Sequence, residues 1–213
     1  SNWFSYYRAL KQRNSVLKNN RISDIYAWNE MLVEEGNKLD NYRKDFFDKT
    51  LKEFHTLLEI LKPYNVFDFF DVINISFFQG WDNEKSLLKI LEENKQTDIR
   101  RKTTTSGPHK SDIKFLIKDI DAKQILSRGE QKFFSILWSC AQHEVLKKHY
   151  RIDATLIIDD IRSELDDRVF NLFKKLLEHN KNQVIFSCID DCFSSKISSN
   201  FKDFKKFHVE QLR

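Results

Sequence analysis

The chain has 213 residues, and 36 lysines and arginines against 32 aspartates and glutamates give it a formal net charge of +4. Its 40% of hydrophobic residues is enough for a buried core, which excludes disordered, collagen-like and mucin-like proteins. No apolar run approaches the roughly 20 residues that span a bilayer, and no signal region opens the chain, so we expect a soluble, cytoplasmic protein without membrane contact.

Glycine is scarce: the 4 glycines stand alone in the sequence. Phosphate-binding loops need glycines close together for tight turns and close backbone approach. Neither the Walker A pattern, Gly-x-x-x-x-Gly-Lys-[Ser/Thr], nor Gly-x-Gly-x-x-Gly occurs. Because the only methionine is Met31, we expect the chain to be a piece of a longer protein.

Residues 1–65 have the apolar spacing of helices. A first helix is predicted over 3–18. A long helix, or two nearly collinear helices hinged near Gly36, is predicted from residue 24 to the stop at Pro63. We expect a helical subdomain whose apolar stripe packs against other elements, with a bare coiled coil as the alternative. The predicted stripe consists of Tyr7, Leu10, Arg13, Asn14, Leu17, Ile25, Trp28, Leu32, Leu39, Tyr42, Phe46, Phe54, Leu57, Leu58 and Leu61.

Residues 66–213 are predicted to be a mixed α/β region. Strand, helix and strand follow one another near its end, which is a βαβ unit and implies a mainly parallel sheet. The predicted strands are 72–78, 103–105, 113–117, 154–158 and 183–188. The predicted helices are a short one capped by Asp82 and ending near Leu91, one over 129–149, and one over 167–179.

Two adjacent carboxylates, Asp159 and Asp160, end the apolar strand 154–158. The carboxyl ends of strands in a parallel sheet line the ligand crevice. In nucleotide-hydrolysing enzymes the first acid binds Mg²⁺ and the second can polarise the attacking water. An ordinary polar end to a strand is the alternative.

A second candidate site is Leu126-Ser127-Arg128-Gly129-Glu130-Gln131-Lys132, at the start of a predicted helix. A serine hydroxyl and the free backbone N–H groups of a helix N-terminus form an anion site, because the helix dipole and the unpaired donors both favour negative charge. The alternative is an ordinary N-cap in which Ser127 and Glu130 form a capping box.

The order of these segments resembles that of the ABC and SMC-type ATPases. Residues 126–131 resemble their signature motif, 157–160 their Walker B strand, and 163–166 (Ser-Glu-Leu-Asp) their D-loop. Over nearly its whole length the chain is similar to the RecF family of bacterial recombination mediators. This similarity is carried by Leu-Ser-Arg-Gly-Glu-Gln-Lys, by Ser-Gly-Pro-His-Lys-Ser-Asp at 106–112, by Tyr-Arg-Ala-Leu-Lys-Gln-Arg-Asn at 7–14 and by Phe-Phe-Gln-Gly-Trp at 77–81.

The resemblance implies the part of an ATPase head that follows the Walker A lobe. Two protomers of such a head sandwich ATP, with Mg²⁺ at the same site. By position, Asp159 would hold Mg²⁺, and Asp160 would be the catalytic acid where related ATPases often have glutamate. Ser187-Cys188-Ile189-Asp190 stands where many relatives have a switch histidine. The residues implied to bind ATP across the dimer interface are Ser127, Arg128, Gly129, Gln131 and Asp166.

The resemblance also implies partners. The longer protein would be a weak ATPase and an ATP-dependent homodimer, associated with the nucleoid. It would bind double-stranded and gapped DNA and act with RecO and RecR to load RecA; this chain alone lacks Walker A and would be inactive. One alternative is a helical protein-interaction module fused to an incomplete ATPase lobe, and another is a different SMC-like or overcoming-lysogenisation-type ATPase.

Basic residues are candidate contacts to the DNA backbone, because cations near phosphates release counterions. The aromatic residues mostly fall on the apolar stripes, so we do not expect them to stack on single-stranded bases. For His109, which follows Pro108 in a predicted turn, we expect a loop-structural role, with a phosphate or DNA contact as the alternative. The candidate DNA contacts are Lys11, Arg13, Arg100, Arg101, Lys102 and Lys110, with Lys18 and Arg21 beside them.

Overall fold

The computed structural model describes residues 2–64, 72–160, 166–179, 183–188 and 203–208. The fold is mixed α/β with a helical N-terminal region, as predicted. By its contacts the chain forms two compact units. The first, here the α1 unit, combines 1–48 with 74–115, and the second, here the α6 unit, combines 49–73 with 116–213. None of the described helices is both long and apolar enough to cross a membrane.

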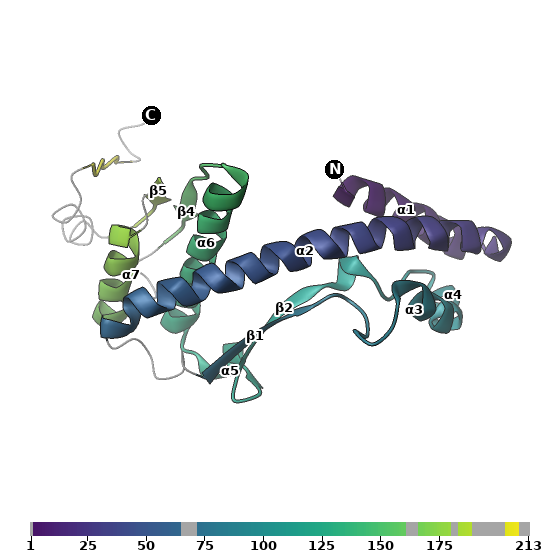
Figure 1. The fold of residues 1–213 in the computed structure, drawn as a ribbon, viewed down its shortest axis with the longest axis horizontal. Coiled ribbons are helices and arrows are strands. Elements are labelled where there is room, and N and C mark those ends of the chain that lie inside the picture. The colour runs from purple at the N-terminus through teal and green to yellow at the C-terminus, as the bar shows by residue number, and fades with distance from the viewer. Residues whose placement is uncertain (1, 65–71, 161–165, 180–182, 189–202, 209–213) are drawn as a thin grey trace. The chain divides into compact units, whose positions relative to one another are not determined.

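In the α1 unit, helix α1 (Asn2–Lys18) lies along the first part of α2 (Ile25–Leu61) (Figure 1). A 3₁₀ turn, Ile22–Asp24, joins the two helices. Buried residues of both helices share one hydrophobic cluster that includes Leu10 and Leu32. Helix α2 continues through Gly36 without a break, so the alternative of two hinged helices was wrong.

The buried face of α1 contains Leu10, Arg13 and Leu17 of the predicted stripe but not Tyr7. Tyr6 is fully buried, whereas Tyr7 is 51% exposed. Ala9 and Val16 also belong to the buried face, and they move its centre towards Tyr6, because each residue turns the helix by about 100°. In α2 a similar error placed Tyr42 on the buried face, although it is 62% exposed.

The short helices of the α1 unit are α3 (Leu87–Glu93) and α4 (Lys95–Arg101). Helix α3 is capped by Ser86, whose hydroxyl accepts a hydrogen bond from the Lys89 N–H at 3.3 Å. The predicted cap at Asp82 was wrong, because its carboxylate instead accepts from the Glu84 N–H at 3.0 Å in a turn before the helix.

The predicted strand over 103–105 was also wrong. The N–H of Thr104 donates to the Asn14 side chain at 2.8 Å, and the N–H of Thr105 donates to the Asp98 carboxylate at 2.9 Å. Side chains therefore occupy the donors that a strand would offer to a neighbouring strand.

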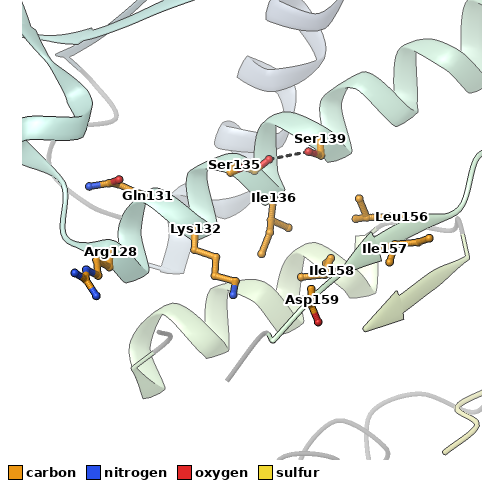
Figure 2. A pocket seen from close by; sticks show the side chains of 10 residues that line it. All are labelled: Arg128, Gln131, Lys132, Ser135, Ile136, Ser139, Leu156, Ile157, Ile158 and Asp159. Carbon is orange, nitrogen blue, oxygen red and sulfur yellow. Dashed lines mark hydrogen bonds between the residues drawn. The ribbon is translucent and has the colours of Figure 1, made fainter. Parts of the chain in front are cut away.

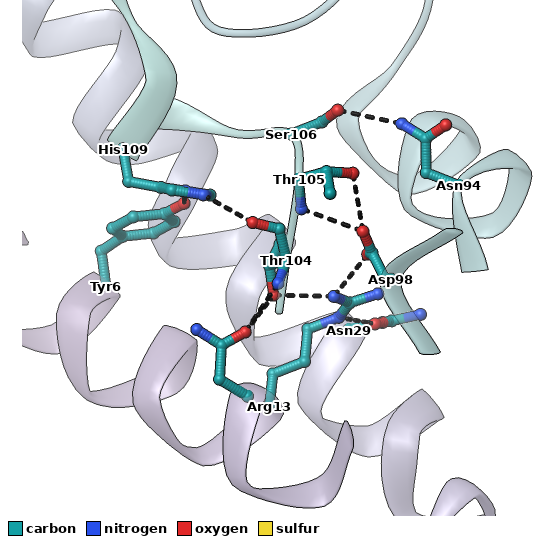
Figure 3. Close-up of polar contacts among 10 residues, drawn as sticks. Tyr6, Arg13, Asn29, Asn94, Asp98, Thr104, Thr105, Ser106 and His109 are labelled. Atoms are coloured by element: carbon teal, nitrogen blue, oxygen red, sulfur yellow. Dashed lines mark hydrogen bonds and ion pairs between the residues drawn. The ribbon is translucent and has the colours of Figure 1, made fainter. Parts of the chain in front are cut away.

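Arg13 lies at the centre of this polar network (Figure 3). Its side chain is fully buried and forms an ion pair with the equally buried Asp98, at 2.7 Å. The same guanidinium donates to Thr104 Oγ1 and Asn29 Oδ1, each at 2.7 Å. A buried charge needs such partners. The prediction that Arg13 contacts DNA was therefore wrong for this fold.

His109 has a structural role in the same unit. Its Nδ1 lies 2.7 Å from the Tyr6 hydroxyl, and its Nε2 lies 3.0 Å from the carbonyl oxygen of Thr104. A neutral ring satisfies both partners if Nε2–H donates to the carbonyl and Nδ1 accepts from the hydroxyl. Burial lowers the pKa of His109 and raises that of Tyr6.

The lowered pKa of His109 predicts a loss of stability on acidification. As the pH falls through the ordinary value of 6.5, the unfolded chain binds a proton that the folded chain does not, so the free energy of unfolding decreases. A His109→Gln variant, which does not titrate there, should show a weaker decrease between about pH 7 and about pH 5. Urea denaturation across this range measures it, and equal pH dependence in both proteins would contradict it.

A three-stranded sheet has the order β1-β2-β3. Its strands are β1 (Ile73–Phe78), β2 (Asp112–Ile117) and β3 (Ile120–Asp121), and β2 and β3 pair antiparallel. The 3₁₀ turns Lys62–Tyr64 and Pro108–Lys110 follow α2 and precede β2, respectively.

The α6 unit contains the predicted βαβ arrangement: β4 (Leu156–Ile158), α7 (Asp167–His179) and β5 (Val184–Phe186). Strands β4 and β5 pair parallel, with Ile157 opposite Ile185. The short helix α5 (Ala122–Ile125) precedes α6 (Arg128–Tyr150), which packs against both β4 and α7. From the last part of α2, Phe54 packs against α6, with its ring centroid 5.3 Å from Phe134 and 5.5 Å from Trp138.

Candidate functional site

The start of α6 forms the first wall of the site. Ser127 is the N-cap, and its hydroxyl accepts from the Glu130 N–H at 3.3 Å while the Glu130 carboxylate accepts from the Ser127 N–H at 2.8 Å. The expected alternative, a capping box, is therefore present. The N–H groups of Arg128 and Gly129 are the first of the helix and have no acceptor within it. The capping box uses the N–H groups of Ser127 and Glu130, so those of Arg128 and Gly129 can bind an anion at the same helix end.

Gln131 fixes the turn that leads into α6. Its side-chain amide donates to the carbonyl oxygen of Leu126 at 2.8 Å and to that of Lys123 at 3.1 Å. Both acceptors precede the helix, so the amide ties α5 to α6. This bonding fixes the turn that carries Ser127 at the start of α6.

The second wall is the carboxyl end of β4. The carboxylate of Asp159 is exposed and accepts from the Ser187 hydroxyl at 2.6 Å. The same hydroxyl accepts from the Asp160 N–H at 2.8 Å, and the Ser187 N–H donates to the Ile158 carbonyl at 3.1 Å. Ser187 therefore links the ends of the two parallel strands. Of the segment 187–190, Ile189 and Asp190 lie outside the described residues.

Lys132 joins the two walls. Its ammonium group donates to the carbonyl oxygen of Asp160 at 2.5 Å. Asp160 has a positive φ of 43°, which turns the chain sharply after β4. Sequence reasoning did not single out Lys132 or Ser187 as site residues. The available signals were that Lys132 directly follows Gln131 and that Ser187 lies near the end of the strand predicted over 183–188.

A hollow of about 560 Å³ lies between these walls (Figure 2). Arg128 and Gln131 come from α6, and Asp159 comes from the end of β4. Lys132 extends from α6 towards that end. The fold thus brings together three residues that were predicted from two separate motifs, 126–131 and 157–160. The lining residues are Arg128, Gln131, Lys132, Ser135, Ile136, Ser139, Leu156, Ile157, Ile158 and Asp159.

The metal site predicted at Asp159 suits magnesium better than a metal ion whose ligands all come from the protein. Among the described residues, no group of three or more histidine, cysteine, aspartate or glutamate side chains is placed to hold a metal ion. Magnesium usually keeps several waters and is bound through one or two carboxylates together with phosphates. The exposed carboxylate of Asp159 is suited to that kind of binding.

Asp166 is not among the residues that line this hollow. Its carboxylate accepts from the Val169 N–H at 2.8 Å and caps α7. Residues 163–165 of the predicted D-loop lie outside the described residues. The proposed interface role of Asp166 therefore remains a prediction, beside a capping role that the hydrogen bond establishes.

The candidate DNA contacts all belong to the α1 unit, and all except the buried Arg13 are exposed. Lys102 is the left-handed C-cap of α4, with φ 54°. Lys110 lies at the end of the 3₁₀ turn that contains His109. The exposed candidates are Lys11, Lys18, Arg21, Arg100, Arg101, Lys102 and Lys110.

No family model matches the chain. Curated relatives named DNA replication and repair protein RecF do match it. The protein of Pseudomonas syringae pv. tomato is 30% identical over 222 residues, covering 100% of this chain and 57% of that protein. The protein of Hahella chejuensis is 32% identical over 218 residues, covering 98% of this chain and 57% of that protein. The protein of Coxiella burnetii is 32% identical over 189 residues, covering 88% of this chain and 51% of that protein.

Two solved structures of RecF share the fold. One is described as the recombination mediator protein RecF-ATP in the RecFOR pathway; it has a TM-score of 0.68 and 21% identity and covers 89% of this chain and 52% of that chain. The other, RecF-ATPrS, has a TM-score of 0.67 and 20% identity. The chain spans about half the length of the curated relatives it matches. By this similarity over its whole length, the chain belongs to the RecF family and corresponds to the C-terminal half of its members.

Proposed function

We propose that this chain supplies one half of a composite ATP site in a RecF-type recombination mediator. The observation that supports it most is the hollow in which the start of α6 and the end of β4 meet. A helix N-terminus offers donors and a positive dipole, and an exposed carboxylate offers a metal ligand. A triphosphate with bound magnesium needs both of these.

The roles of the residues follow from their positions. The hydroxyl of Ser127 and the N–H groups of Arg128 and Gly129 bind the γ-phosphate of ATP held by a second protomer. Asp159 is a ligand of Mg²⁺, and Ser187 orients its carboxylate through the 2.6 Å hydrogen bond. Asp160 serves as the acid next to the attacking water, and Lys132 fixes its backbone. Gln131 positions the phosphate-binding turn.

In this proposal, ATP joins two protomers into a homodimer, and the dimer binds double-stranded and gapped DNA. One solved RecF structure is described as a recombination mediator with ATP in the RecFOR pathway, which supports RecO and RecR as partners. Together they help to load RecA. Hydrolysis is slow, because an aspartate at position 160 reaches less far than a glutamate. The DNA surface includes exposed basic residues of the α1 unit.

The metal role of Asp159 is tested in a protein of the relatives' length that carries this sequence. Asp159→Asn removes a negative oxygen ligand, and we expect the gain in ATP affinity on adding Mg²⁺ to fall by about tenfold or more. Calorimetric titration with ATP, with and without Mg²⁺, measures it. Asp153→Asn is the control, because its side chain is 85% exposed and lies before β4. An unchanged effect of Mg²⁺ on Asp159→Asn would contradict the assignment.

A further inference from the structure

The solvent face of α1 is positively charged. This helix of 17 residues contains no aspartate or glutamate. Three of its four cationic residues, Arg8, Lys11 and Lys18, are exposed, while Arg13 is buried with Asp98. At about 100° per residue, Lys11 and Lys18 lie one above the other on the face opposite Arg13. The face is therefore free of carboxylates along its own helix.

The same face begins with exposed aromatic rings. Phe4 is 71% exposed, Tyr7 51% and Trp3 40%. The rings of Trp3 and Tyr7 stack, with centroids 5.9 Å apart and planes at 28°. The Arg43 guanidinium lies 5.4 Å from the centroid of the Trp3 ring and braces it from α2. Single exposed apolar residues are ordinary on protein surfaces, but three within two helical turns form a patch.

Three carboxylates of the neighbouring helix α2 are paired with lysines. On α2, Lys38 pairs with Glu34 at 2.7 Å and with Glu35 at 2.9 Å, and Lys44 pairs with Asp40 at 2.8 Å. The cations of α1 have no comparable ion pairs among the described residues, apart from that of Arg13. An anionic partner is therefore favoured by charge.

We propose that the outer face of α1 binds a single-stranded segment of nucleic acid. Bases stack on Phe4 and Tyr7, and the phosphates that follow lie along Arg8, Lys11 and Lys18. At about 1.5 Å per residue, the helix extends about 21 Å from Phe4 to Lys18. A duplex keeps its bases stacked inside, so it can use only the cations. This rests on the proposed DNA-binding function and assigns its single-strand contacts. It departs from the expectation that the aromatic residues do not stack on single-stranded bases.

The aromatic part is tested by fluorescence anisotropy with a short labelled single strand and with the duplex of the same sequence. For the double variant Phe4→Ala with Tyr7→Ala, we expect a loss of single-strand affinity of about tenfold or more, because a stacked base contributes about 1–3 kcal/mol, and little change for the duplex. Phe207→Ala is the control, because Phe207 is also 71% exposed but belongs to the α6 unit. It should change neither affinity.

The cationic part behaves differently. The double variant Lys11→Glu with Lys18→Glu should bind both the single strand and the duplex more weakly. The slope of log affinity against log salt concentration should fall in magnitude by about two. A third measurement uses the intrinsic fluorescence of the wild-type chain. Of its tryptophans, Trp3 is exposed, Trp28 is half-buried, and Trp81 and Trp138 are buried. Single strands should quench the fluorescence of Trp3, and the quench should disappear in Trp3→Phe.

The possible failures are distinguishable. Unchanged single-strand affinity in the aromatic double variant, or equal losses for both substrates, overturns the inference and leaves the proposed DNA binding in place. No quench of Trp3 by a single strand that binds also overturns it. No binding of wild-type protein to either substrate overturns both the inference and the DNA-binding part of the proposed function.

Discussion

Replacing Arg13 with alanine is expected to lower the free energy of unfolding of this chain by about 3–5 kcal/mol. The reason is the buried position of its partner. Asp98 is fully buried, and without the guanidinium its charge has no cationic partner in the network. Thr104 and Asn29 would lose their donor as well. Urea denaturation measures the change.

Two further variants locate the effect in the ion pair. Arg8→Ala removes an exposed cation from the same helix and should change stability by no more than about 0.5 kcal/mol. Arg13→Met combined with Asp98→Asn should cost less than the sum of the single changes, because neither charge then remains buried alone. A loss for Arg13→Ala no larger than that for Arg8→Ala would show that the pair does not stabilise the unit.

Replacing Ser127 with arginine is expected to abolish ATP-dependent dimerisation of a protein of the relatives' length that carries this sequence. The new side chain occupies the space in front of α6 where the proposed phosphate binds, and it removes the hydroxyl from the N-cap. Sedimentation velocity with and without ATP measures the mass. The monomer should persist at ATP concentrations that convert the wild type to a dimer.

Loss of a helix cap alone costs about 0.5–2 kcal/mol, so stability needs its own control. Ser86→Arg provides it, because Ser86 is also an exposed N-cap whose hydroxyl accepts from the third N–H of its helix, α3. We expect Ser86→Arg to dimerise normally. Dimerisation of Ser127→Arg that matches the wild type would remove Ser127 from the nucleotide site.

The sequence predicts local elements well and distant pairings poorly. Helix α7 begins and ends where its strict apolar spacing predicts, at Asp167 and His179, and its βαβ context follows from the strands on either side. The same reasoning singles out the start of α6 and the end of β4, and residues of both line one hollow. Both predictions depend on patterns within about 30 residues of each other.

The errors depend on partners that lie far away in the sequence. Arg13 was predicted both on the packing stripe and as a DNA contact, and only its pairing with Asp98, 85 residues later, decides between the two. Tyr6 and Tyr7 are equally apolar candidates, and the partner of Tyr6, His109, is 103 residues away. Ser187 reaches Asp159 only because β4 and β5 pair in parallel. The spacing of residues along the sequence does not predict these contacts, because they form only in the folded chain.

The central claim is that Ser127 acts on nucleotide held by the other protomer, and one mixing measurement tests it directly. Ser127→Arg protein is mixed with protein whose Walker A loop, in the half that precedes this sequence in such proteins, is disabled. Neither should dimerise alone with ATP. If Ser127 acts in trans, the mixed pair contains one intact site, and sedimentation should detect an ATP-dependent heterodimer. A mixture that stays monomeric with ATP, like its two components, would contradict the account.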